Sequence, residues 1–249
     1  MASARLKLAD FLNLLLPRVC AACSRLMDEE EPGLVCGRCW SRLAPLPAPT
    51  CARCGHPTRG LECRWCDRLP VFVRAARSVT WTHRGSALHI LHALKYAGWS
   101  AAGDAIGERM ARTSWPLDVR EECRAVVPVP LAAARERERG YNQSLLLATA
   151  FGARWGRPVW DDMLFRVRGT RSQTRLTPDD RSRNVSRAFR VATGAERRLS
   201  GAHILLVDDV LTTGATLNEC ATVLYEAGAR IVSYVTFGRA PTAADRNQP

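Results

Sequence analysis

The pattern of apolar and polar positions divides the chain into a regular part and an irregular part. From about residue 71 onward, short apolar runs alternate with stretches in which apolar residues recur every three or four positions. The runs predict strands at residues 71–81, 125–129, 159–167 and 204–207, and the stretches predict helices at 88–95, 101–111, 145–155 and 215–227. Strands that alternate with helices indicate an α/β domain with a parallel sheet. Residues 17–70 show neither period, and a short amphipathic helix is predicted before them, over residues 5–16.

The most informative stretch is residues 204–216, which read I-L-L-V-D-D-V-L-T-T-G-A-T. Its first four residues form a run typical of a strand buried on both faces, and Asp208 and Asp209 follow at the predicted end of that strand. The 212–216 loop then leads into a helix, whose N-terminus offers unpaired N–H groups and a partial positive charge to a phosphate. Gly214 allows the backbone to approach closely. Two carboxylates beside such a loop suit a donor-rich group such as a ribose diol, so the stretch predicts a ribose 5-phosphate site.

This stretch resembles the motif with which type I phosphoribosyltransferases bind phosphoribosyl pyrophosphate (PRPP). The resemblance implies that Asp208 and Asp209 hold the ribose hydroxyls and that Mg²⁺ accompanies PRPP. It also implies that the 5′-phosphate lies on the loop formed by Thr212, Thr213, Gly214, Ala215 and Thr216. A strand, loop and helix that merely pack together are disfavoured, because paired buried acids each need a partner.

Eight of the ten cysteines form four Cys-x-x-Cys pairs in the irregular part: Cys20, Cys23, Cys36, Cys39, Cys51, Cys54, Cys63 and Cys66. By count and spacing they predict two tetrahedral, four-thiolate structural zinc sites. Metal would stabilise a segment with few large apolar residues. Disulfides are disfavoured because no secretory signal is recognisable. Pairing of neighbouring Cys-x-x-Cys units is favoured over alternating pairing. The intervening arginines and tryptophans suit either nucleic-acid binding or a ribbon that docks a protein or is purely structural, with a solvated basic face.

Several polar residues are candidates for the pyrophosphate side of the site. Arg137 and Arg139 follow the predicted strand at 125–129, and ligands of open parallel sheets bind beyond the strand ends. Arg171 and Gln173 lie in the long polar stretch 168–183, which can close over a pyrophosphate. Lys95 is either a phosphate contact or an ordinary helix-surface residue. Cys123 and Cys220 are interpreted as packing residues.

Charge and hydropathy limit the partners and the compartment. The 249 residues carry a formal net charge of +12, and only Lys7 and Lys95 among the basic residues are lysine. Arginine suits bidentate phosphate contacts, so acidic or phosphorylated partners are expected. The apolar run at 11–16 is followed by Pro17 and lacks the features of a signal peptide. No apolar run reaches membrane-spanning length. A cytoplasmic protein without membrane insertion is predicted.

Across residues 10–240 the chain resembles the ComF/ComFC family. The motifs that carry this resemblance are the Cys-x-x-Cys pairs, L-K-Y-x-G, R-x-R-G-Y-N-Q, T-x-x-Q-x-x-L, R-x-x-N-V-x-x-A-F and the PRPP motif. Tyr141 stands where phenylalanine is common. The resemblance implies an N-terminal helix and double zinc ribbon over residues 1–70 and a phosphoribosyltransferase-like domain over residues 71–249. It also implies a link to natural competence, with single-stranded DNA and other competence proteins as partners.

Two classes of function fit these features. A phosphoribosyltransferase would pass the phosphoribosyl group of PRPP to a nucleophile, in competence or in an unrelated salvage reaction. A non-catalytic module would sense PRPP or a nucleotide, or bind nucleic acid, with the same atoms. The sequence indicates no catalytic base, so turnover separates the two.

Overall fold

The computed structural model describes residues 17–28, 30–58, 63, 65–96, 102–167, 188–242 and 245. The predicted helix at 5–16 and the whole polar stretch 168–183 lie outside these residues. None of the helices in the described part combines the length and the apolar character needed to cross a membrane.

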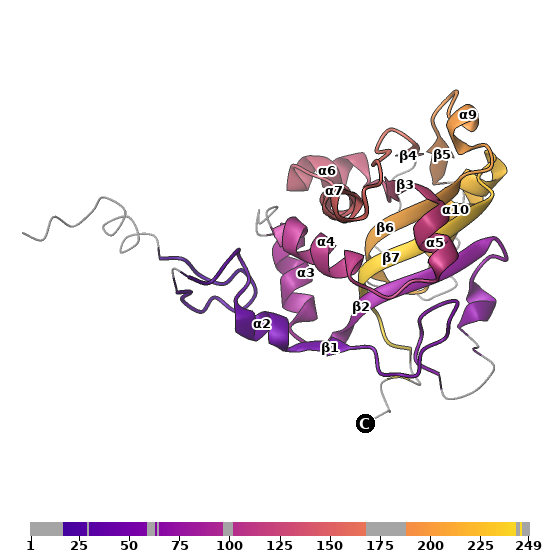
Figure 1. Cartoon of the computed structure of the whole chain (residues 1–249). Coiled ribbons are helices and arrows are strands. Elements are labelled where there is room, and N and C mark those ends of the chain that lie inside the picture. Colours follow the sequence, from indigo (N-terminus) through magenta and orange to yellow (C-terminus); the bar gives the residue numbers. More distant parts are fainter. Residues whose placement is uncertain are drawn as a thin grey trace, which may run out of the picture.

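A five-stranded sheet forms the centre of the molecule (Figure 1). Its strands, in spatial order, are β1 (Leu43–Pro45), β2 (Val73–Gly85), β7 (Ile231–Arg239), β6 (His203–Leu211) and β3 (Cys123–Pro128). All neighbouring strands are parallel except β1, which pairs antiparallel with β2 at the edge. The continuous apolar runs of β6, in the interior of the sheet, and of β3, at its edge, fit strands of a parallel sheet that is covered on both faces.

Each face of the sheet has its own apolar core. Leu205 and Val207 of β6 face α3 (Ala87–Tyr96), α4 (Ala102–Ala111) and α7 (Gln143–Trp155). Ile204 and Leu206 face the other way, toward α10 (Ala215–Glu226) and a small two-stranded sheet of β4 (Leu164–Arg166) and β5 (Phe189–Val191). The short helices of the described residues are α2 (Gly37–Ser41), η1 (Cys66–Arg68), α5 (Leu117–Glu122), α6 (Ala133–Arg139) and α9 (Glu196–Leu199). Successive side chains of β6 point to opposite faces of the sheet, so this one strand contributes residues to both cores.

The predicted helices at 88–95, 101–111, 145–155 and 215–227 are confirmed within one or two residues. The predicted strands at 71–81 and 125–129 correspond to β2 and β3, and β2 lies inside the central sheet beside β7. The strand predicted at 159–167 was wrong in its extent, because this stretch contains only the short β4, although Val159 makes a single bridge to Val126. The basic stretch after β3 forms the helix α6.

The cysteine-rich part packs directly on this sheet. β1 extends the sheet, and Cys54, Trp65 and Leu69 belong to the same core as Tyr234 of β7. The segment that contains Cys20, Cys36 and Cys39, drawn in indigo in Figure 1, packs against α3. The boundary at residue 70 therefore crosses a shared core, and two separate domains stay a prediction.

Candidate functional site

The two carboxylates lie within β6, not after it. The ladder with β7 continues through them, with Asp208 opposite Thr236 and Leu211 opposite Arg239. The strand therefore ends four residues later than the apolar run, because its backbone stays paired with β7 as far as Leu211. Gly214 then adopts a left-handed conformation with φ +86° and caps α10. A side chain would be strained there, and the loop presents the N-terminus of a twelve-residue helix at the edge of the sheet.

Asp208 is the outer member of the pair. It is half-buried, and its Oδ1 accepts hydrogen bonds of 2.9 Å from Ser144 Oγ and from the backbone N–H of Asp209. Burial raises the pKa of Asp208 to about 7, and the neighbouring charge of Asp209 adds to the shift. Asp208 therefore takes up a proton more readily than an exposed carboxylate does.

Asp209 is the inner member and has a charged partner. Asp209 is 6% exposed, and its Oδ2 forms an ion pair with Nζ of Lys95 at the end of α3. Burial alone would raise the pKa of Asp209, but the ammonium group outweighs it and holds the pKa below its ordinary value. Burial likewise opposes the charge of Lys95, but Asp209 keeps the pKa of Lys95 above its ordinary value. The ion pair therefore favours the charged form of Asp209, and the pKa values of the two adjacent carboxylates shift in opposite directions.

Residues 139–144 connect this pair to the neighbouring helices. Arg139 Nη1 donates to Gln143 Oε1 over 2.8 Å, at the junction of α6 and α7. The side chain of Asn142 caps α7 by accepting from the backbone N–H of Ser144 at 3.0 Å, and it donates to the carbonyl of Val129 at 3.1 Å. The hydroxyl of Tyr141 donates to the carbonyl of Leu94, next to Lys95. The R-G-Y-N-Q sequence thus fixes α3 and α7 around the carboxylates.

The structure brings together some of the predicted site residues and not others. Lys95 lies on Asp209, and the charge of Arg139 is close enough to affect the pKa of both Lys95 and Asp209. Arg137 is exposed on α6. Arg171 and Gln173 lie outside the described residues.

Sequence reasoning missed the contacts of Ser144 and Asn142. The sequence did carry a signal for them, because an asparagine directly before an apolar helical period is a typical N-cap. The partner of Ser144, 64 positions away, had no such signal.

The eight paired cysteines form two groups in the manner that pairing of neighbours predicts. Within each group the four sulfur atoms lie within 4.8 Å of one another. The groups are Cys20, Cys23, Cys36 and Cys39, and Cys51, Cys54, Cys63 and Cys66. We call them the first and the second cluster.

The sulfur positions fit zinc. Shortest contacts are 3.8 Å in the first cluster and 3.4 Å in the second, whereas a disulfide needs about 2.05 Å. Four thiolates at about 2.3 Å from Zn²⁺ would lie about 3.8 Å apart at the corners of a tetrahedron. Each group supplies four ligands, so both sites are closed and structural. Cys123 and Cys220 are buried elsewhere, in keeping with packing roles.

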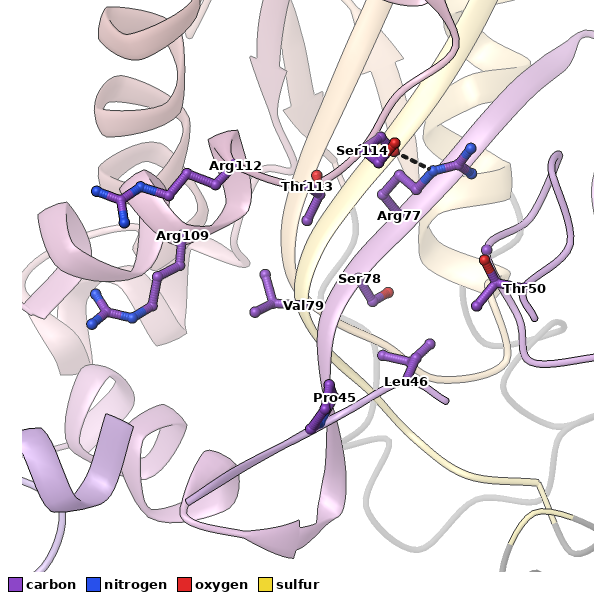
Figure 2. A pocket seen from close by; sticks show the side chains of 11 residues that line it. Pro45, Leu46, Thr50, Arg77, Ser78, Val79, Arg109, Arg112, Thr113 and Ser114 are labelled. Atoms are coloured by element: carbon purple, nitrogen blue, oxygen red, sulfur yellow. Dashed lines mark hydrogen bonds between the residues drawn. The ribbon is translucent and has the colours of Figure 1, made fainter. Parts of the chain in front are cut away.

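A cavity of about 390 Å³ lies between α4, β2 and the segment after β1 (Figure 2). Arg77, Arg109 and Arg112 line it, but each is already engaged. Arg77 donates to main-chain carbonyls that include Ser114 and Ala52, Arg109 stacks on Trp40, and Arg112 pairs with Glu108. In Figure 2 the side chains of Arg109 and Arg112 extend away from Arg77. No residue of the 212–216 loop lines this cavity, so it is separate from the carboxylate site.

Comparison with known proteins finds two matching domain families. A double zinc ribbon domain model matches residues 11–69, and a phosphoribosyl transferase domain model matches residues 164–248. DNA utilization protein YhgH of Salmonella typhimurium is 33% identical over 229 residues, which cover 88% of this chain and 96% of that protein.

Two further relatives carry competence names. Competence protein ComFC of Bacillus subtilis is 29% identical over 201 residues, covering 78% of this chain and 79% of that protein. Competence protein F of Haemophilus influenzae is 35% identical over 116 residues, covering 47% of this chain and 50% of that protein. With two cysteine clusters ahead of a parallel α/β sheet, and with these relatives, the chain belongs to the ComF/ComFC family of double-zinc-ribbon proteins with a phosphoribosyltransferase domain.

Proposed function

We propose that this protein binds PRPP at the end of β6. One observation carries the proposal: the Asp208–Asp209 pair is followed, after residues 210–213, by a glycine-capped helix N-terminus, and Lys95 of α3 forms an ion pair with Asp209 at the same edge. The loop offers backbone N–H groups to a 5′-phosphate. The carboxylates offer acceptors to the two ribose hydroxyls.

The geometry supports different roles for the two carboxylates. Asp209 is buried and forms an ion pair with Lys95. It therefore both contributes to binding the ribose diol and keeps Lys95 in place. Asp208 is the more accessible and accepts from Ser144 already, so it presents its other oxygen to the ribose. Lys95 and Arg139 are the proposed contacts for the pyrophosphate, and Arg137, Arg171 and Gln173 are further candidates.

Magnesium would accompany PRPP, because the ion prefers oxygen ligands from one or two carboxylates and from phosphates. The half-buried carboxylate of Asp208 fits that preference. When bound, Mg²⁺ would neutralise part of the pyrophosphate charge.

Transfer of the phosphoribosyl group would break the bond between C1 and the pyrophosphate oxygen and form a bond from C1 to a nucleophile. The positive groups of Lys95 and Arg139 would stabilise the negative charge that develops on the departing pyrophosphate. No described side chain at the loop is placed as a dedicated base. A module that binds PRPP without turnover would use the same atoms, so pyrophosphate release in the presence of candidate nucleophiles decides between them.

Calorimetric titration of PRPP with Mg²⁺ into the zinc-loaded protein tests the proposal. We expect saturable binding that is lost in the Asp208→Asn, Asp209→Asn double variant. Asp162→Asn is the matched control, because Asp162 is an exposed carboxylate paired with Arg198 away from the loop. Absence of binding to the wild-type protein, or equal binding by the double variant, would refute the site.

A role in handling single-stranded DNA during natural competence is a second proposal, placed in the cytoplasm with other competence proteins as partners. The net charge of +12 and the names of the relatives favour it. We expect affinity for a single-stranded oligonucleotide to fall steeply with rising salt, because phosphate binding releases counterions. Affinity that does not change with salt would contradict it.

A further inference from the structure

Asn218 joins three parts of the molecule one turn into α10. Its backbone N–H donates to the carbonyl of Gly214 at 2.8 Å, and a Cβ added at Gly214 would lie 3.6 Å from its amide nitrogen. Its Oδ1 accepts from the hydroxyl of Tyr234 on β7 at 3.1 Å. Its Nδ2 donates to the carbonyl of Arg68 at 2.6 Å, across 150 positions of sequence.

Arg68 belongs to the part of the chain that contains the second cluster. It ends the turn η1, which starts at the metal-ligand residue Cys66. The backbone N–H of Leu69 donates to the carbonyl of Cys66 at 2.9 Å, so the turn is held on that cysteine. The Arg68 carbonyl therefore keeps its position only while Cys66 keeps its own.

Arg239 makes a second connection between the same cluster and the same edge of the sheet. It is fully buried, lies opposite Leu211, and so is next to the start of the 212–216 loop. Its Nη2 donates to the carbonyl of Cys54 at 2.7 Å, and its guanidinium group stacks 4.4 Å from the ring centre of Trp65. Its Nε and Nη1 have no hydrogen-bond acceptor among the described residues.

The charge of a zinc-loaded cluster suits this arginine. Four thiolates around one Zn²⁺ carry a net charge of about −2, and a buried cation needs a nearby opposite charge. Arg239 donates a hydrogen bond to the backbone carbonyl of Cys54, a residue of that cluster. Loss of the metal would change both the charge beside Arg239 and the shape of the turn that ends at Arg68.

We propose that the zinc-loaded second cluster positions the 212–216 loop through Asn218 and Arg239, so that zinc retention and ligand binding at the loop are coupled. Asn218 and Arg239 are positioning residues in this proposal. It deepens the proposed function, since the loop is the proposed phosphate site. By linkage the coupling is reciprocal, so a ligand on the loop should also slow zinc release from the second cluster.

The first cluster provides an internal comparison. Cys20, Cys36 and Cys39 pack on the α3 side of the sheet, in the core opposite to α10. The hydroxyl of Ser86 contacts the carbonyl of Cys39 just before α3. The first cluster therefore supports the helix that carries Lys95, and the second supports the helix that follows the loop.

Hydrogen exchange tests the coupling without any ligand. In the zinc-loaded protein, Cys63→Ser should raise amide exchange across residues 212–218 by about five-fold or more, whereas Cys23→Ser in the first cluster should leave it unchanged. Asn218→Ala keeps all eight ligands and should raise the same exchange with two zinc ions still bound. Glu226→Gln, at the exposed far end of α10, is the matched control and should change nothing.

Zinc release supplies the second measurement. We expect PRPP with Mg²⁺ to slow chelator-driven release of one of two zinc ions from the wild-type protein by about five-fold, and to have no such effect in Asn218→Ala. If wild-type protein binds PRPP but Asn218→Ala shows normal exchange and the same slowing, the coupling is refuted while PRPP binding stands. If the wild-type protein does not bind PRPP, the proposed function fails, and the exchange data alone decide the coupling.

Discussion

At the scale of single residues, the contact between Lys95 and Asp209 has the largest expected effect on stability. Both groups are mostly buried, so removing one leaves an uncompensated charge. We expect Asp209→Asn to lower the free energy of unfolding by about 3 kcal/mol, measured by urea denaturation. Lys95→Met combined with Asp209→Asn should cost less than the sum of the single changes, because no buried charge is left. Strict additivity would show that the two groups do not interact.

The protonation of Asp208 gives a stability effect with a defined sign. Its pKa is raised from 3.8 to about 7, so between those values the folded state holds a proton that the unfolded state releases. The contribution of Asp208 to the free energy of unfolding is therefore full below pH 4 and is lost as the pH rises toward 7. We expect the stability of Asp208→Asn minus that of the wild-type protein to rise by on the order of 2 kcal/mol between pH 5 and pH 8. A pH-independent difference in urea denaturation would contradict the raised pKa.

At the scale of elements, the loop that starts α10 depends on the conformation of Gly214. Its φ of +86° is unfavourable for alanine, although no atom would lie closer than 3.6 Å to the added carbon. We expect Gly214→Ala to cost about 1 to 2 kcal/mol of stability and to weaken PRPP binding at least ten-fold, in denaturation and calorimetric measurements.

Gly156 provides the matched control for this change. It also has a left-handed φ of +62°, caps α7 and has no atom within 4 Å of the added carbon. Gly156→Ala should cost similar stability and leave PRPP binding intact. Equal loss of binding in both variants would mean that destabilisation, and not the loop, is responsible.

At the scale of the whole molecule, the ribbons and the sheet share their cores, and this favours a single unfolding transition. Cys54 and Trp65 lie in one core with Tyr234, and Cys36 lies in the other with Leu91. We expect two zinc ions per chain and a thermal midpoint that falls for the entire protein when a chelator removes them. Calorimetric scans that show an unchanged sheet transition after metal removal would establish that the ribbons fold independently.

The sequence by itself determined the four long helices and the residue types that are available to the candidate site. Local periods are short-range, so the helices α3, α4, α7 and α10 could be predicted within one or two residues. The four Cys-x-x-Cys pairs and the D-D-V-L-T-T-G-A-T stretch are contiguous, and their residue types alone restrict the ligands they suit.

Only the tertiary structure decided which distant residues meet. The sequence of β2 does not indicate that this strand pairs with β7, because the local pattern of a strand does not identify its partner. The ion pair of Lys95 with Asp209, the bond of Ser144 to Asp208 and that of Asn218 to Arg68 each join segments that are 64 or more positions apart. Such contacts depend on how the helices pack on the sheet, which no local pattern encodes, and they are what make two identical adjacent aspartates chemically different.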